Sequence, residues 1–301
     1  MGSPSERAWR VGGPVPPDFV PMQVVAAPDG SGWLFGWRGG EPLSERQGSI
    51  LAVSAEGAVS VAWSGPGWVR CASMRGSAGF AVQGRPGPVF TLLAASEGGR
   101  WRDVGPIPAG SVTSVLAVDA EEAWLSGAGG LLRYFRGAFT QVSAPGDRDS
   151  TRERLFLAGE QVVLATPAGL HLAREGGARW GHRDMEGAHV RALAFPYIAA
   201  VREGRVEIGR LEPAFVSWLG VVGGEGDPAA LAWAGKAMQL ALVPANPRAN
   251  PGMILVASNP AGGFSTTLLK LPPTEGWIGL SGAKGALALA ASRELLQSGP
   301  S

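Results

Sequence analysis

Cysteine is almost absent from this sequence. Cys71 is its one thiol, so no disulfide can form within the chain, and its setting in VRCAS is typical of a small buried core residue. The first residues, MGSPSERAWRVGG, contain no apolar stretch of the kind found in a secretory signal peptide. We therefore expect a cytoplasmic protein.

Long apolar runs and an excess of one charge are also missing. The longest apolar stretches, such as VTSVLAV and GALALAA, fall far short of the roughly 20 residues that a membrane-spanning helix needs. The formal net charge is +1, which gives the chain no overall field to attract nucleic acid or anionic lipid. Neither a membrane span nor a nucleic-acid partner is expected.

Glycine, proline and apolar residues are plentiful instead. The sequence holds 46 glycines and 24 prolines spread along its length, and 45% of its residues are hydrophobic. Turn-forming residues between short apolar runs are typical of many short strands. One phrase occurs twice, as AASEGGRWRD at 94–103 and as AREGGARWGH at 173–182, which indicates a repeat.

The repeat is clearest between residues 112 and 146. This segment contains four β-prone runs, VTSVLAV, AWLSG, LLRYF and FTQVS, which predict one meander of four strands. Segments 69–108 and 154–184 repeat the same order, and a period of about 40 residues is typical of β-propellers. Extending the register gives the units 21–67, 68–110, 111–150, 151–189, 190–228 and 229–276.

The two ends of the chain supply one more unit. Residues 277–301 contain only three strand-like runs, and RAWRVGG within residues 1–20 resembles the outermost strand of the other units. Pairing these segments would close a ring and remove its open edges. We predict one all-β domain: a seven-bladed β-propeller with four-stranded antiparallel blades, closed by pairing the N-terminal strand with the C-terminal three strands. Six blades, or an open β-solenoid, are the alternatives.

The repeated phrase falls between the third and fourth strands of its units. Its glycines allow the positive φ angles of a tight hairpin, and the tryptophan that follows is expected to pack between neighbouring blades. Trp9, Trp63, Trp101, Trp180 and Trp218 all fall near this point of their units.

The core of the phrase, SEGGRW in one copy and REGGARW in the other, resembles the Asp-box. This S-x-D-x-G-x-T-W hairpin belongs to sialidase-like and BNR-repeat propellers, and it also occurs in propellers of the photosystem-II-assembly-factor type. Ser96 and Glu175 stand at the aspartate position, and alanine replaces the serine in both copies. The resemblance implies the propeller fold without an activity, since Asp-boxes in these families are structural and lie away from the active site.

Residues for catalysis or metal binding are scarce. A sialidase-like enzyme needs a tyrosine nucleophile with a glutamate partner, an aspartic acid and an arginine cluster. Tyr134 and Tyr197 are the two tyrosines, and both are expected away from the central ligand face. His171, His182 and His189 lack the spacing of a metal site. We expect no catalytic residue, no metal and no cofactor.

Arginines at the start of the innermost strands form a first set of candidate contacts. Counting back from the aromatic residue of each second strand aligns Arg70 with Arg154 and Arg191, and the same place holds Gln23 and Ser114 in other units. Innermost strands line the central channel, where three arginines would be placed to bind a carboxylate or a phosphate. The alternative is that they pair with neighbouring acids or with loop carbonyls.

Two long insertions provide the second set. WRGGEPLSERQG (37–48) and PANPRANPG (244–252) both fall between second and third strands, in units that flank the closing one. They should rise from the same side of the ring, here called the long-loop face, and binding residues concentrate on such loops. The alternative is that they are tolerated surface insertions. The candidate contacts in them are Arg38, Glu45, Arg46 and Arg248.

These observations favour a non-enzymatic scaffold that presents its long-loop face to a protein partner. The excess of arginine over lysine indicates a GC-rich bacterial genome, and some bacterial conflict and ATPase-associated systems use divergent, Trp-containing propellers as partners. The alternative is a binder of a small anionic ligand or a glycan, or a hydrolase or lyase, that uses the channel mouth with Arg70, Arg154 and Arg191.

Overall fold

The structure is a computed structural model, and it describes residues 10–27, 29–40, 42–96, 99–108, 110–145, 149, 152–222, 226–233, 238–246, 253–257, 266–270, 274–281, 285–290 and 294–298. Within these residues the regular structure is almost entirely β-strand, apart from two short 3-10 helices, η1 (Leu43–Glu45) and η2 (Glu175–Gly177). No helix in this part of the chain is long and apolar enough to cross a membrane.

Six sheets are antiparallel meanders of four consecutive strands. In chain order they are β2 (Phe19–Ala26), β3 (Gly32–Arg38), β4 (Gln47–Val53) and β5 (Val59–Pro66); β6 (Trp68–Arg75), β7 (Ala78–Arg85), β8 (Val89–Ala95) and β9 (Trp101–Pro106); β10 (Val112–Ala117), β11 (Glu122–Gly127), β12 (Gly130–Phe135) and β13 (Ala138–Val142); β14 (Arg154–Ala158), β15 (Gln161–Thr166), β16 (Gly169–Arg174) and β17 (Arg179–Arg183); β18 (His189–Ala194), β19 (Tyr197–Arg202), β20 (Arg205–Leu211) and β21 (Val216–Val221); β22 (Asp227–Trp233), β23 (Met238–Val243), β24 (Met253–Ala257) and β25 (Thr266–Lys270).

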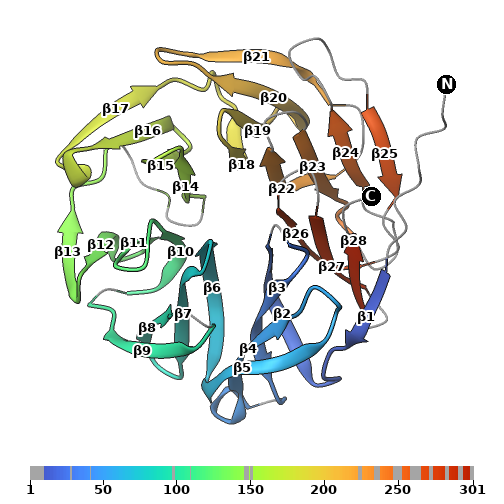
Figure 1. The fold of residues 1–301 in the computed structure, drawn as a ribbon. Helices are drawn as coiled ribbons and strands as arrows, with labels where there is room; N and C mark the ends of the chain where they lie inside the picture. Colours follow the sequence, from blue (N-terminus) through green and yellow to red (C-terminus); the bar gives the residue numbers. More distant parts are fainter. Residues whose placement is uncertain are drawn as a thin grey trace.

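The seventh sheet joins the two ends of the chain. Its order is β1 (Arg10–Pro14), β28 (Glu294–Ser298), β27 (Gly285–Ala290) and β26 (Thr274–Ser281), with β1 antiparallel to β28. The sheets are arranged as a ring around a common centre, where the channel is expected, with β26 beside both β2 and β22 (Figure 1). The predicted seven-bladed propeller, with its last blade shared between the two ends of the chain, is confirmed.

The hydrophobic core lies between adjacent sheets. One core cluster, for example, joins Phe80 and Leu92 of one sheet to Leu125 and Tyr134 of the next. Middle strands such as β7 are buried along nearly their whole length because a neighbouring sheet covers each of their faces, whereas the outer strand β13 is mostly exposed. This pattern explains why middle strands such as β7 and β8 are mostly apolar rather than alternating.

The repeated phrase makes the turn from the third to the fourth strand, as its glycines predict. In the second copy Gly176 and Gly177 have φ angles of 64° and 93°. Trp180 follows on β17 and packs edge-to-face on Trp124 of the preceding sheet, with ring centroids 6.1 Å apart. In the first copy Trp101 packs on Trp33 of the preceding sheet at 5.9 Å. Both tryptophans therefore seal a boundary between blades, whereas Trp9 lies outside the described residues.

Candidate functional site at the mouth of the central channel

Most innermost strands carry a β-bulge near their start. In five of them the pairing register skips one residue at the same place relative to the second strand. A bulge leaves its extra residue outside the ladder and redirects that side chain. The bulged residues are Met22, Arg70, Thr113, Arg191 and Ala229. Arg70 and Arg191 therefore occupy equivalent positions in two different blades.

Arg154 occupies a different position, which corrects the alignment made from the sequence. It pairs with Ala165 within the ladder of β14 and β15. Gln23 and Ser114 lie at the corresponding place, one residue after the bulges of their own strands. The alignment from the sequence placed Arg154, Gln23 and Ser114 at the position of Arg70. It is wrong by one residue, because a bulge adds one residue to its strand.

At the position that follows the bulge, the side chains of Gln23 and Ser114 link one blade to the next. The amide of Gln23 donates from Nε2 to the carbonyl of Ala72 and accepts the Ala72 N–H at Oε1, both at 2.8 Å. Ser114 accepts the backbone N–H of Leu155 at Oγ, at 3.3 Å. The start of the channel wall is therefore held by polar contacts that run between innermost strands.

Arg154 adds positive charge to this wall. It donates from Nη1 to the carbonyl of Glu153 at 2.8 Å. A contact of this kind, with a backbone carbonyl, was the alternative to ligand binding for these arginines. Burial lowers the pKa of Arg154, and the positive charge of Arg191 lowers it further. Burial also raises the pKa of the Cys71 thiol to about 12, although Arg70 and Arg154 act in the opposite direction. Cys71 is thus an unreactive thiol that lies within the field of two of these arginines.

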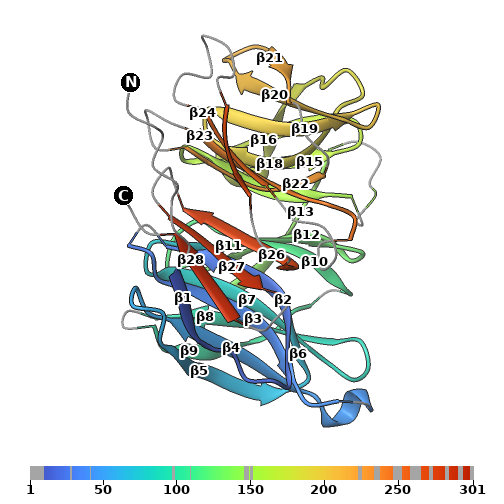
Figure 2. The same ribbon diagram turned by 90° about the vertical axis from the view of Figure 1, so that its right-hand side faces the viewer.

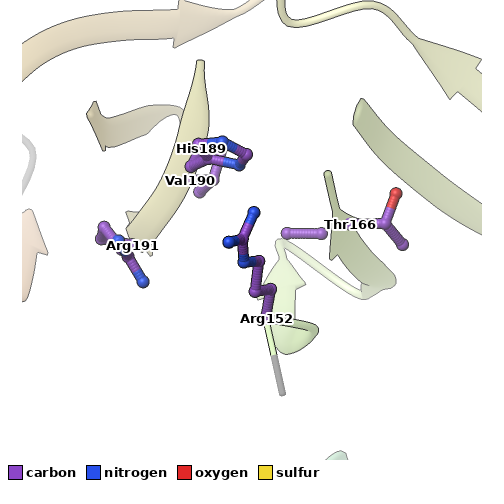
Figure 3. Close-up of a pocket in the computed structure, with 6 residues that line it drawn as sticks. Arg152, Thr166, His189, Val190 and Arg191 are labelled. Atoms are coloured by element: carbon purple, nitrogen blue, oxygen red, sulfur yellow. The ribbon is translucent and has the colours of Figure 1, made fainter. Parts of the chain in front are cut away.

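A cavity of about 200 Å³ opens beside Arg191, between the sheet that begins with β14 and the sheet that begins with β18. Figure 3 shows the guanidinium of Arg152 directed toward the imidazole of His189, and Arg191 lies on the same strand as His189, β18. The cavity is lined by Arg152, Ala165, Thr166, His189, Val190 and Arg191. Two guanidinium groups and one imidazole from separate segments therefore surround a small space.

Sequence reasoning singled out only Arg191 among the residues of this cavity. Arg152 lies in the charged connection GDRDSTRERL, which is typical of a solvated loop, and His189 has no ligand spacing. The two residues come together because the connection before β14 and the start of β18 lie at the same end of neighbouring blades. One feature of the sequence could have indicated this site: Arg152 lies just before one innermost strand, and His189 is the first residue of the next.

Two histidines lie behind the cavity wall. His171 and His182 are paired directly across β16 and β17, with ring centroids 4.9 Å apart. The hydroxyl of Thr166 lies 3.1 Å from Nε2 of His171, which is buried. Burial lowers the pKa of His171, and the proximity of His182 lowers it further. Within the described part of the chain no three His, Cys, Asp or Glu side chains gather in a way that could hold a metal.

The first long insertion forms an ordered loop between β3 and β4. Arg38 donates from Nε to both carboxylate oxygens of Asp18 at 3.1 Å. Arg46 stacks over the ring of Trp37 at 4.7 Å, and its carbonyl accepts the N–H of Gly67 at 2.8 Å. The loop is therefore anchored at both of its ends.

The tip of this loop is η1, which projects from one face of the ring at the lower right of Figure 2. Leu43 in η1 is 45% exposed, and Glu45 is exposed beside it. Arg248, the candidate contact of the other insertion, lies outside the described residues. The candidates from the sequence thus fall into two groups: one on this loop, and one around the channel.

The tyrosines are core residues. Tyr134 packs edge-to-face on Phe80 at 5.6 Å, and Tyr197 packs on Trp233 at 4.8 Å. Each is 5% exposed. Neither phenol is placed to act as a sialidase-like nucleophile.

A second cavity, of about 460 Å³, lies on the opposite face near η2. Glu122 in its wall accepts the indole N–H of Trp124 and the Nε–H of Arg133 at Oε1, each at 2.8 Å. Since Glu122 and Arg133 are already paired with each other, these two groups have less to offer an ionic ligand than the arginines of the cavity beside Arg191.

Neither the protein-family models nor the curated proteins contain a match to this sequence. Solved structures do resemble it. The β-propeller domain of Cps50 (Swd1) from Myceliophteria thermophila has a TM-score of 0.64 at 11% identity, over 97% of this chain and 99% of that one. The WD40 repeats of RRP9 give 0.63 at 9% identity, over 97% and 100%. YCF48 bound to a D1 peptide gives 0.61 at 14% identity, over 97% of both chains. At these identities the likeness shows the β-propeller fold alone.

Proposed function

We propose that this chain is a non-enzymatic scaffold that binds a protein partner through its long-loop face, within a bacterial multiprotein system. Because neighbouring strands run in opposite directions, second-to-third connections and fourth-to-first connections leave the ring on one face. That face holds the anchored loop between β3 and β4, together with the mouth of the channel at the start of the innermost strands.

The anchored loop is the observation that carries this proposal. Its tip presents the apolar side chain of Leu43 to solvent, and its base holds an arginine stacked on Trp37. A loop that is already fixed loses little conformational entropy on binding, and tryptophan and arginine are over-represented among the residues that dominate interface energies. We take Leu43, Glu45 and Arg46 as the centre of the contact, with Arg38 and Arg248 beside it.

The fold likeness is consistent with this role. YCF48, which shares the fold over 97% of this chain, has been solved with a bound D1 peptide. We also propose that this chain is related to Asp-box propellers, because of its two SEGGRW-like turns. A cytoplasmic location is proposed because Cys71 is the single cysteine and its thiol is unreactive.

The proposal is tested by purifying the tagged protein from native cells and resolving the eluate by size exclusion. Wild type should co-elute with a stoichiometric protein partner. The double variant Leu43→Ala with Arg46→Ala should lose at least nine-tenths of that partner, whereas Phe135→Ala should retain it. Phe135 is a matched control because it is also exposed (39%) but is the last residue of β12, next to the third-to-fourth turn on the opposite face. Elution of wild type alone would count against the proposal, as would equal retention by both variants.

A further inference from the structure

We propose that the cavity bounded by Arg152, His189 and Arg191 binds the phosphate group of a phosphate monoester. This goes beyond the protein-partner function, because the ligand would bind whether or not the loop between β3 and β4 engages a partner. The three side chains come from the connection before β14 and from the start of β18.

The balance of charge around the cavity favours an anion. No hydrogen bond or ion pair joins the side chain of Arg191 to an acceptor among the described residues, and its charge acts electrostatically on the guanidinium of Arg154. Arg152 uses Nε for an ion pair with Asp149 at 3.4 Å, which leaves its two terminal nitrogens available. None of the residues lining the cavity is an acid. The guanidinium groups of Arg191 and Arg154 repel each other, and a bound dianion would relieve that repulsion.

The directions of the donors favour phosphate over carboxylate. A planar carboxylate is matched by one guanidinium fork, whereas a tetrahedral phosphate accepts hydrogen bonds from several directions. Here the cavity is lined by Arg152 from the connection before β14 and by His189 and Arg191 from the start of β18 (Figure 3). Donors that come from two separate segments suit a tetrahedral anion, which accepts hydrogen bonds from more than one direction.

Thr166 forms a wall of the cavity rather than a ligand. Its hydroxyl already lies within hydrogen-bond distance of Nε2 of His171, and its oxygen accepts the N–H of Ala168 at 3.2 Å. The remaining lining, Ala165 and Val190, is small and aliphatic. The imidazole of His189 is the one aromatic ring among these lining residues, and as a donor to the phosphate it is not free to stack on a nucleobase. The ligand is therefore a phosphate carried on a small or flexible group, such as a polyol phosphate or a phosphorylated side chain.

Arg70 provides an internal control. It occupies the same bulge position on β6 as Arg191 does on β18, yet it does not line this cavity. Removing either arginine changes the net charge by the same amount. A difference between the two variants therefore reports on the cavity and not on the overall field of the protein.

The test is a calorimetric titration of the full chain with inorganic phosphate, matched against sodium chloride of equal ionic strength. Wild type should bind phosphate saturably. Arg191→Ala and Arg152→Ala should each weaken binding about tenfold or more, since each removes a charge-assisted hydrogen bond, and Arg70→Ala should leave it unchanged. Circular dichroism in chloride checks that each variant is folded, and Arg191→Gln replaces any variant that is not.

The absence of saturable phosphate binding by wild type would overturn the proposal. So would an equal loss in Arg70→Ala and Arg191→Ala, which would indicate a general electrostatic effect. A second set of titrations with glycerol phosphate, a phosphoserine peptide and its unphosphorylated form distinguishes the sources. Tighter binding of glycerol phosphate identifies a free small ester, and tighter binding of the phosphoserine peptide identifies a modified protein, whereas binding of the unphosphorylated peptide with equal affinity contradicts the site.

Discussion

The indole N–H of Trp180 donates a hydrogen bond to the carbonyl of Ser143 at 2.9 Å. Trp180 lies on β17, whereas Ser143 immediately follows the last strand of the preceding sheet, so this bond spans a blade boundary. The same indole packs edge-to-face on Trp124. One side chain thus supplies both an apolar and a polar contact between two blades.

Truncation of Trp180 should weaken this boundary. Trp180→Ala removes the ring and the hydrogen bond, and we expect the free energy of unfolding to fall by about 3 kcal/mol. Trp180→Phe keeps an aromatic ring but loses the donor, so about 1 kcal/mol is expected. Urea denaturation measures both values. Wild-type stability in Trp180→Ala would mean that the indole does not seal the boundary.

Gly177 should resist substitution for two separate reasons. Its φ angle is 93°, and an added Cβ would lie 2.6 Å from the ring of Trp124 and 2.8 Å from Val142. Gly177→Ala therefore combines backbone strain with a steric clash, and should cost about 3 kcal/mol.

Gly187 offers the matched control for this substitution. Its φ angle is 80°, but an added Cβ meets nothing within 4 Å. Gly187→Ala should cost only the backbone strain, about 1 kcal/mol. Thermal unfolding of the two variants separates strain from packing, and equal losses would contradict the close approach of Gly177 to Trp124.

Gln23 should contribute more than Ser114 to the polar contacts between innermost strands. Gln23→Ala leaves both backbone groups of Ala72 without this partner, and a loss of about 2 kcal/mol is expected. Ser114→Ala removes one longer contact to Leu155 and should cost about 0.5 kcal/mol. Chemical denaturation of the two variants tests this order, and the reverse order would contradict it.

Stability should decrease as the solution is acidified through the range in which histidine titrates. The pKa of His171 is lowered by folding from its ordinary value of 6.5, so the unfolded chain takes up a proton that the folded chain does not. The stabilising contribution is complete above pH 6.5 and is lost progressively as the pH falls from there toward the folded-state pKa.

The variant His171→Gln isolates this effect. It cannot titrate at this position and keeps a polar group beside Thr166, so its stability should vary less between pH 7.5 and pH 5 than that of wild type. Carboxylates titrate equally in both proteins and cancel in the comparison. Parallel stability curves for the two proteins would show that His171 is not the titrating group.

The sequence was sufficient to predict the architecture because the middle strands are apolar and the glycine-rich turns recur at a fixed period. It was not sufficient to predict the channel. A bulge inserts one residue without an obvious signal in the sequence. Arg70 and Arg154 were therefore aligned with each other, although Arg70 is the bulged residue of its strand and Arg154 occupies the position that follows the bulge in other strands. Arg152 and His189 come together only through the packing of two blades, which no local pattern encodes.

The pairing of β1 with β28 has a kinetic consequence. Arg10 lies opposite Gln297, so the last ladder cannot form until β28 has been synthesised. A contact with so large a sequence separation forms slowly, because closing a long loop costs conformational entropy before any stabilising contact is made. On the ribosome, the earlier blades can assemble in order while the ring remains open. Completion of the ring is therefore the last step in the folding of this domain, and the interval before it is when the unpaired strand edges are most exposed to aggregation.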